Sequence, residues 1–259
     1  MATIIYPSPI FGPIHSRRLG VSLGVNLQPG DGKVCSFDCI YCECGFNADH
    51  RPHSPRPTRK QVAEALEETL TRMKADGGHL DVITFAGNGE PTGHPDFAAI
   101  IDDTIALRDR HFPEAKVSVL TNSTFAHRPD IHDALMKVDN NIMKLDTIDD
   151  DYIRMVDRPA SPSYRAKDII STIASFHGHA IVQTMFMKGT TGGRDVDNTT
   201  DRFVNPWLEA LRRIAPHEVM IYTIDRETPD HGLLKATHEE LNNIRDRVAA
   251  MGIECTASY

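Results

Sequence analysis

Four of the five cysteines in this chain lie between positions 35 and 44: Cys35, Cys39, Cys42 and Cys44. Clustered cysteines bind metals, form disulfides or act as redox pairs. A tetrahedral zinc site needs four ligands. Only Cys39 and Cys42 form a C-x-x-C pair, so zinc would have to recruit Cys44 or a histidine, His50 or His53. A redox pair would leave Cys35 without a role. The spacing C-x-x-x-C-x-x-C indicates three ligands, with Cys44 either a fourth ligand or a small residue beside the site.

Around this loop the sequence alternates short apolar strands with helices. Strands are predicted at 21–27, 80–87, 116–122, 141–147, 180–187 and 218–224, with a further short strand at 253–258. Helices are predicted at 58–76, 94–112, 129–138, 163–177, 205–215 and 237–251. Strands that are apolar throughout, each followed by a helix, predict a parallel sheet covered by helices. This α/β pattern fits an open doubly wound sheet or a full or partial barrel of the triosephosphate-isomerase type.

Glycines and polar residues follow several of the predicted strands. The segment "GNGEP" (87–91) comes after the second strand, and Asn122 and Ser123 end the third. In both architectures the carboxyl ends of the strands form the site. Glycines let the backbone approach a ligand closely, and Glu90 supplies a charge. The alternative interpretation is that these residues make turns and cap the next element.

The cysteine spacing, followed one strand later by "GNGEP", resembles the radical S-adenosylmethionine (SAM) superfamily. The resemblance implies that Cys35, Cys39 and Cys42 hold a 4Fe–4S cluster whose remaining iron is chelated by SAM. It also implies that the reduced cluster cleaves SAM to a 5′-deoxyadenosyl radical, which takes a hydrogen atom from a substrate, and that the enzyme is oxygen-sensitive. The implied fold is a partial (β/α)6 barrel. We predict a single domain over residues 1–259, with an N-terminal extension (1–20), a cluster loop (33–46) and a C-terminal helix (237–251).

The same resemblance implies a set of SAM contacts near the strand ends. The expected adenine contacts are Tyr41, Tyr222 and Ile224. Candidates for the ammonium, ribose and carboxylate are Gly87, Asn88, Gly89, Glu90, Asn122, Ser123 and Gln183. For Gln183 the alternative is a hydrogen-bonded core amide.

Lys144 and Asp146 are the candidate catalytic residues on the substrate side. They are two positions apart on one predicted strand, so both side chains point to the same face. Lys144 could bind a substrate carboxylate or phosphate, or form a Schiff base if burial lowers its pKa. The alternative is a structural ion pair at the rim of the barrel.

Charged and glycine-rich segments elsewhere suggest further contacts. Arg17 with Arg18, and Asp225 with Arg226, lie beside turns, where arginine suits recognition of carboxylate or phosphate. Surface salt bridges are the alternative. The segment 188–198 contains paired glycines and is predicted to be a mobile lid over the site.

The wider likeness points to one subgroup. "PIHSRRLGVSLGVNL", "TFAGNGEPTGHPDF", "MKLDT", "VDRPA" and "MIYTIDRETPDHG" resemble the radical SAM subgroup that contains wyosine-type tRNA-modifying enzymes and shorter relatives. The tRNA-modifying members carry extra upstream cysteines for a second cluster, and this chain has none before Cys35. We therefore expect a small molecule, peptide or protein as substrate. The alternatives are tRNA, or a non-catalytic binding protein stabilised by zinc or a cluster. The expected electron donor is a flavodoxin or ferredoxin.

Composition adds weaker limits. The chain has 259 residues and a formal net charge of −8, which disfavours a protein that coats nucleic acid. The sequence has no apolar run of the ~18 residues that span a membrane and no recognisable signal peptide. We expect a cytoplasmic protein, where clustered cysteines are metal or redox sites more often than disulfides.

Overall fold

The computed structural model describes residues 3–16 and 19–259, so Arg17 and Arg18 lie outside the described residues. The main sheet has eight strands in the order β1-β2-β3-β4-β5-β6-β9-β11. Their bounds are Ile10–Ser16 (β1), Gly20–Val25 (β2), Val82–Phe85 (β3), Lys116–Thr121 (β4), Asn140–Lys144 (β5), Ile181–Met185 (β6), Glu218–Tyr222 (β9) and Glu254–Ser258 (β11). Strand β1 is antiparallel to β2, and the remaining neighbours pair in parallel.

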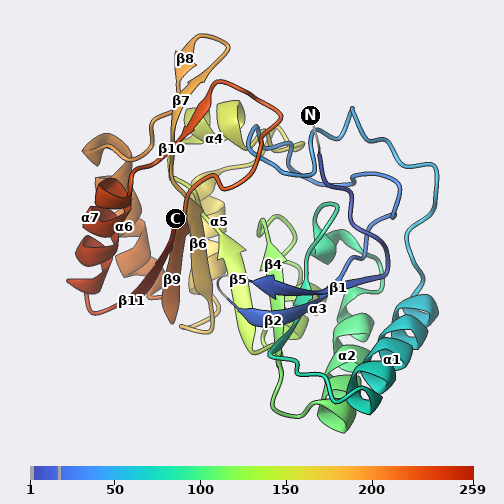
Figure 1. Cartoon of the computed structure of the whole chain (residues 1–259). Coiled ribbons are helices and arrows are strands. Elements are labelled where there is room, and N and C mark those ends of the chain that lie inside the picture. Colours follow the sequence, from blue (N-terminus) through green and yellow to red (C-terminus); the bar gives the residue numbers. More distant parts are fainter. Residues whose placement is uncertain (1–2, 17–18) are drawn as a thin grey trace.

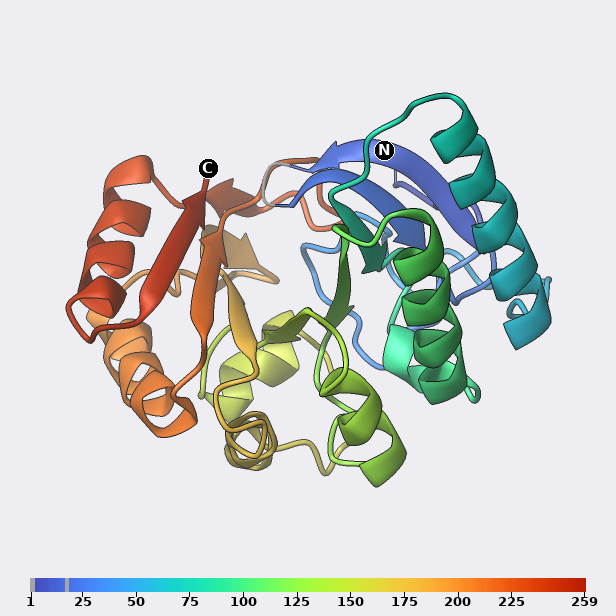
Figure 2. The same ribbon diagram turned by 90° about the horizontal axis from the view of Figure 1, so that it is seen from below.

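Most of the helices pack on one side of this sheet; Asp150–Val156 instead lies beyond the strand ends (Figure 1), where Ile40 N donates to Val156 O. The helices are α1 (Arg59–Ala75), α2 (Phe97–His111), α3 (Pro129–Leu135), α4 (Asp150–Val156), α5 (Ala166–Ala174), α6 (Asp201–Ile214) and α7 (His238–Ala249), with a short 3-10 helix η1 (Pro91–Gly93). Figure 2 shows the sheet curled into an open arc with helices along its outer face. No described helix combines the length and apolar character needed to cross a membrane.

The strand order decides between the two predicted architectures. A doubly wound sheet reverses its strand order at a switch point, whereas the parallel strands here follow one another in chain order. The partial (β/α)6 barrel is therefore confirmed, with six strand–helix units and a further parallel strand, β11.

Local sequence signals account for the helix ends. Thr58 caps α1 and Thr237 caps α7, each in a reciprocal capping box with Gln61 or Glu240. Such a cap stabilises a helix by about 1 kcal/mol relative to alanine. Leu66 and Leu70 on the inner face of α1 are completely buried. The apolar core between helices and sheet includes buried residues from every parallel strand except β11, whose Cys255 and Ala257 are partly buried against it.

Three features were not expected from the sequence: strand β1, helix α4 and a small second sheet. That sheet has the order β10-β7-β8 and is formed by Leu233–Lys235 (β10), Met187–Thr191 (β7) and Arg194–Asp195 (β8). The predicted lid at 188–198 therefore contains a β-hairpin. Gly192 and Gly193 make its two-residue turn, both with positive φ, as such turns require. Figure 1 shows this sheet beyond the ends of β6 and β9, above the main sheet.

Candidate active site

The inside of the barrel holds a cavity of about 510 Å³. Residues from β1, β2, β3, β4, β5, β6 and β9 line it, with Tyr41, Cys42 and Glu43 of the cysteine loop. Alternate strand positions face it, as Gln183 and Met185 do on β6. Cys42, the third cysteine of the motif, therefore lies at the barrel interior.

Backbone hydrogen bonds hold the cysteine loop at this end of the barrel. Val34 N donates to Asn88 O at 2.9 Å, which fixes the loop against the segment after β3. On the other side Asp38 N donates to Asp157 O at 3.0 Å and Ile40 N to Val156 O at 2.9 Å. The loop is thus clamped between the "GNGEP" segment and the end of α4.

The three predicted ligands, Cys35, Cys39 and Cys42, are partly buried free thiols. Burial raises the pKa of Cys35 to about 12 and raises that of Cys39 well above its ordinary value. The neighbouring Cys44 side chain, and then the charge of Lys33, lower the pKa of Cys42 to about 6.

Within residues 3–16 and 19–259, no three His, Cys, Asp or Glu side chains converge as a single metal ion requires. A 4Fe–4S cluster needs no such convergence, because each thiolate binds a different iron. An all-thiolate donor set is also the set that such clusters prefer. The residues present therefore fit a cluster.

Cys44 is buried and turned toward the barrel wall. Its Sγ lies 3.4 Å from Gly87 O, to which it donates, and only 2 % of the residue is exposed. This position fits the interpretation of Cys44 as a small residue packed beside the site.

Glu90 is buried and already has four protein donors. Its carboxylate accepts hydrogen bonds from the amide and hydroxyl of Thr92, from Thr121 Oγ1 at 2.7 Å and from Asn122 N at 2.7 Å. Burial nevertheless raises the pKa of Glu90. The carboxylate predicted to bind the SAM ammonium is therefore placed behind the cavity wall, where it orders the segments after β3 and β4.

Asn88, Gly89, Asn122 and Ser123 occupy the same supporting layer. The Asn122 amide donates to Ser36 Oγ at 2.8 Å and approaches Cys35 Sγ at 3.7 Å. The buried Ser123 hydroxyl has no hydrogen-bond partner within the described part of the chain. None of these four residues lines the cavity.

The other predicted SAM contacts do line the cavity: Tyr41, Gly87, Gln183, Tyr222 and Ile224. The structure thus divides the predicted set in two. One half faces the cavity beside Cys42, and the other half holds the cysteine loop in place.

Lys144 and Asp146 form a buried ionic cluster with Asp157. Asp157 is not among the residues predicted from the sequence. Lys144 Nζ pairs closely with Asp146 and lies 3.0 Å from Asp157 Oδ1. The Tyr41 hydroxyl donates to Asp146, and the lysine sits 4.5 Å from the centre of the Tyr41 ring. The available signal was "VDRPA", which contains Asp157.

The two carboxylates decide the protonation of this lysine. Burial alone disfavours its charge, but Asp146 and Asp157 raise the pKa of Lys144 well above its ordinary value. A Schiff base requires an amine whose pKa is lowered. The pKa of Lys144 is raised, so the arrangement does not favour a Schiff base at this lysine. The contacts match the alternative interpretation, a structural ion pair.

A second set of polar contacts missed from the sequence joins three distant segments at the cavity. Tyr6 donates to Glu43 Oε1 at 2.8 Å, and Arg226 donates to Glu43 Oε2 at 2.8 Å. Asp225, the other charged candidate beside Arg226, also lines the cavity and lies 3.9 Å from Lys235. These pairs connect the N-terminal segment, the cysteine loop and the end of β9.

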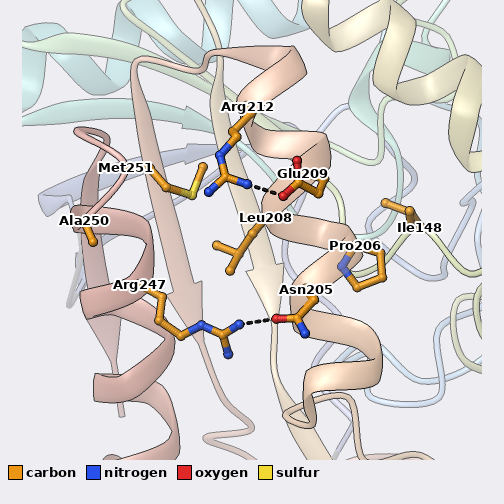
Figure 3. Close-up of a pocket in the computed structure, with 9 residues that line it drawn as sticks. All are labelled: Ile148, Asn205, Pro206, Leu208, Glu209, Arg212, Arg247, Ala250 and Met251. Carbon is orange, nitrogen blue, oxygen red and sulfur yellow. Dashed lines mark hydrogen bonds and ion pairs between the residues drawn. The ribbon is translucent and has the colours of Figure 1, made fainter.

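A larger hollow of about 740 Å³ lies outside the barrel between α6 and α7. Figure 3 shows its arginines already engaged, Arg212 with Glu209 and Arg247 with Asn205. None of the cysteines and none of the predicted SAM contacts lines it. The chemistry-bearing residues therefore assign the site to the smaller cavity inside the barrel.

The sequence profile of the Radical SAM superfamily matches residues 31–203. The chain belongs to the radical SAM superfamily.

Similar sequences and folds agree with this assignment. UPF0026 protein MJ1312 of Methanocaldococcus jannaschii is 31% identical over 82% of this chain and 62% of its own length. A UPF0026 protein of Helicobacter pylori (strain J99) is 27% identical over 84% of this chain and 66% of its own length. The chain thus spans about two thirds of these relatives.

Two solved structures share the fold. A radical SAM methyltransferase from Sphaerobacter thermophilus superposes with a TM-score of 0.67 at 17% identity, covering 92% of this chain and 66% of its own. TYW1 with a lysine-pyruvate adduct bound has a TM-score of 0.61 at 14% identity, covering 88% of this chain and 73% of its own. At such identities the likeness concerns the fold.

Proposed function

We propose that Cys35, Cys39 and Cys42 hold a 4Fe–4S cluster and that SAM binds in the barrel cavity. One observation carries the proposal: Cys42 belongs both to the cysteine motif and to the cavity wall, which it shares with Gly87 and Tyr222. Such a cluster, once reduced, would supply one electron to the sulfonium of SAM, so that a carbon–sulfur bond would break to leave methionine and a 5′-deoxyadenosyl group able to take a hydrogen atom from the substrate.

The cavity lining suits a ligand of this chemistry. Among the described residues, Glu43, Asp225 and Glu227 place three carboxylates around the cavity and Arg226 places one guanidinium there, a balance that favours a cationic sulfonium and ammonium. Aromatic and aliphatic side chains supply apolar walls for an adenine ring; they include Tyr41, Met185, Met220, Tyr222 and Ile224.

The small second sheet keeps water from one side of the cysteine loop. Ile40, which follows Cys39 in the sequence, is fully buried. It belongs to an apolar cluster with Met187 of β7 and Val196, the residue after β8. An apolar cover of this kind controls solvent access, and with it the potential of an iron–sulfur centre. The predicted lid segment is thus proposed as a fixed cover over the loop.

Lys144 and Asp146 are proposed as positioning residues. The pair holds the Tyr41 hydroxyl, and Tyr41 in turn forms part of the cavity wall. Because Lys144 keeps its proton, we assign it the role of a fixed charge beside Cys39. Burial raises the pKa of the Cys39 thiol, and the charge of Lys144 partly opposes that rise.

For the substrate we propose a small molecule, or a group of a peptide or protein that reaches the cavity. The net charge of −8 and the acidic lining disfavour a polyanion. A flavodoxin or ferredoxin is the proposed source of electrons. Binding of tRNA that falls steeply with salt would instead support the wyosine-type alternative.

The test is anaerobic reconstitution with iron and sulfide, followed by addition of SAM. We expect bound iron and sulfide, visible iron–sulfur absorption and a change in the spectrum of the reduced cluster when SAM binds. Protein that takes up one zinc and no iron under the same conditions would contradict the proposal and favour the non-catalytic alternative.

A further inference from the structure

Lys33 places a buried ammonium at the start of the cysteine loop. The residue is 3 % exposed, and its Nζ donates to Gly45 O at 2.5 Å. Its carboxylate partner is Asp38, with Oδ1 3.5 Å away. An ammonium has three donors, and burying it is costly unless they are paired. One carbonyl and one carboxylate at this distance leave part of that charge uncompensated.

Both partners of Lys33 belong to the cysteine loop. Asp38 directly precedes Cys39 in the sequence, and Gly45 N donates to Cys42 O at 2.9 Å. The ammonium of Lys33 therefore lies inside the loop whose three sulfurs would carry the charge of a cluster.

The buried charged groups Lys144 and Glu90, which also lie beside the loop, have close side-chain partners of their own. Lys144, beside Cys39, is held between the buried carboxylates Asp146 and Asp157. Glu90 is satisfied by its four protein donors. The carboxylate of Asp38 is 30 % exposed, so water screens its charge, whereas the side chain of Lys33 is only 1 % exposed.

We infer that Lys33 raises the reduction potential of the cluster held by Cys35, Cys39 and Cys42; the inference rests on the proposed function. Reduction adds one electron, and hence one more negative charge, to the cluster. A fixed cation in a dry site stabilises the reduced form more than the oxidised form. Lys33 acts on the cluster from beside it, as a positioning residue.

The experiment is a redox titration of the reconstituted holoenzyme, with dithionite as the source of the electron and electron paramagnetic resonance as the readout. Lys33→Met keeps the length of the side chain and removes its charge. We expect the ratio of reduced to oxidised cluster at a fixed poise to fall about tenfold or more, which is about 59 mV for a one-electron couple. Lys137→Met, an exposed lysine paired with Asp102, is the matched control and should leave the potential unchanged.

A second variant shifts the potential in the opposite direction. Asp38→Asn removes the negative partner of Lys33 but keeps the oxygen that accepts from Asn47 N at 2.8 Å. A negative charge beside the loop is then lost and that of Lys33 is less compensated, so we expect a higher potential. The fall in Lys33→Met is the shift that a purely structural role for Lys33 does not predict.

Each outcome has a definite meaning. Unchanged potentials in Lys33→Met and Asp38→Asn, with clusters intact, overturn the inference and leave the proposed function standing. If Lys33→Met fails to assemble a cluster, Lys33→Gln decides, because it also removes the charge but keeps a donor for Gly45 O: a fall in its potential supports the inference and no change overturns it. A wild-type protein without a cluster would instead overturn the proposed function.

Discussion

Gly89 and Val34 form an isolated parallel β-bridge between the segment after β3 and the start of the cysteine loop. Gly89 has a φ of +137°, and a Cβ at this position would lie 1.9 Å from Val34 O. Glu90 N also donates to that carbonyl, at 3.3 Å. The two motifs that identify the family are therefore joined by contacts that require a residue without a side chain.

Gly89→Ala should weaken both the fold and cluster assembly. The backbone conformation alone costs a residue with a side chain about 1–3 kcal/mol, and the clash with Val34 adds to this. Urea unfolding and iron content after reconstitution are the measurements. Gly77→Ala is the matched control, because Gly77 has a φ of +68° and open space around it. Equal losses of stability and iron in the two variants would contradict this account of Gly89.

Lys144→Met should be strongly destabilising, because it leaves Asp146 and Asp157 buried without their cation. Breaking a buried pair in this way costs about 3–5 kcal/mol. Asp157 is ionised in the wild type only above pH 7, so the comparison is made there. Adding Asp157→Asn removes the second acidic group beside Asp146, so the double variant should regain part of the loss in urea unfolding. A double variant no more stable than Lys144→Met would show that the ionic cluster does not act as a unit. Lys137→Met, at an exposed pair, should cost at most about 1 kcal/mol.

The stability of the apoprotein should depend on pH through Asp157. Burial raises the pKa of this carboxyl to about 7, with Lys144 opposing the rise and Asp146 adding to it. The folded chain then retains a proton that the unfolded chain releases near pH 4. The contribution of Asp157 is therefore full at low pH and is lost as the pH rises toward 7, by at most about 1.4 kcal/mol per pH unit.

Asp157→Asn should remove this part of the pH dependence, because an amide does not titrate in this range. The measurement is urea unfolding of wild type and variant at a series of pH values between about 4 and 7. Parallel profiles for the two proteins would show that Asp157 titrates no differently in the folded and unfolded states.

The sequence was sufficient to predict the strand–helix alternation because the strands are apolar throughout and the helices carry clear caps. Cys42, Tyr41 and Gln183 are predicted as site residues from the cysteine spacing, the family resemblance and a strand position, and all three line the cavity. Strand β1 was not predictable in this way, because its exposed, proline-containing sequence has no strand pattern.

Contacts between distant segments were the other part that the sequence could not supply. Asp157 meets Lys144 only because α4, which was not predicted, returns the chain to the end of β5. The sequence predicts that Glu90 faces the ligand. In the structure its carboxylate accepts hydrogen bonds from Thr121 and Asn122 at the end of the neighbouring strand, and the sequence alone does not show that these donors lie beside it. The paired glycines of the hairpin were interpreted as flexible, although two glycines between extended residues also signal a tight turn.

The most direct test of the central claim is 5′-deoxyadenosine formation by reconstituted, dithionite-reduced protein supplied with SAM. We predict that wild type and Cys44→Ala form this product, and that Cys35→Ala, Cys39→Ala and Cys42→Ala each lose both the cluster and the product. Cleavage of SAM by a variant lacking one of these three cysteines, or no product from iron-loaded wild type, would contradict the account.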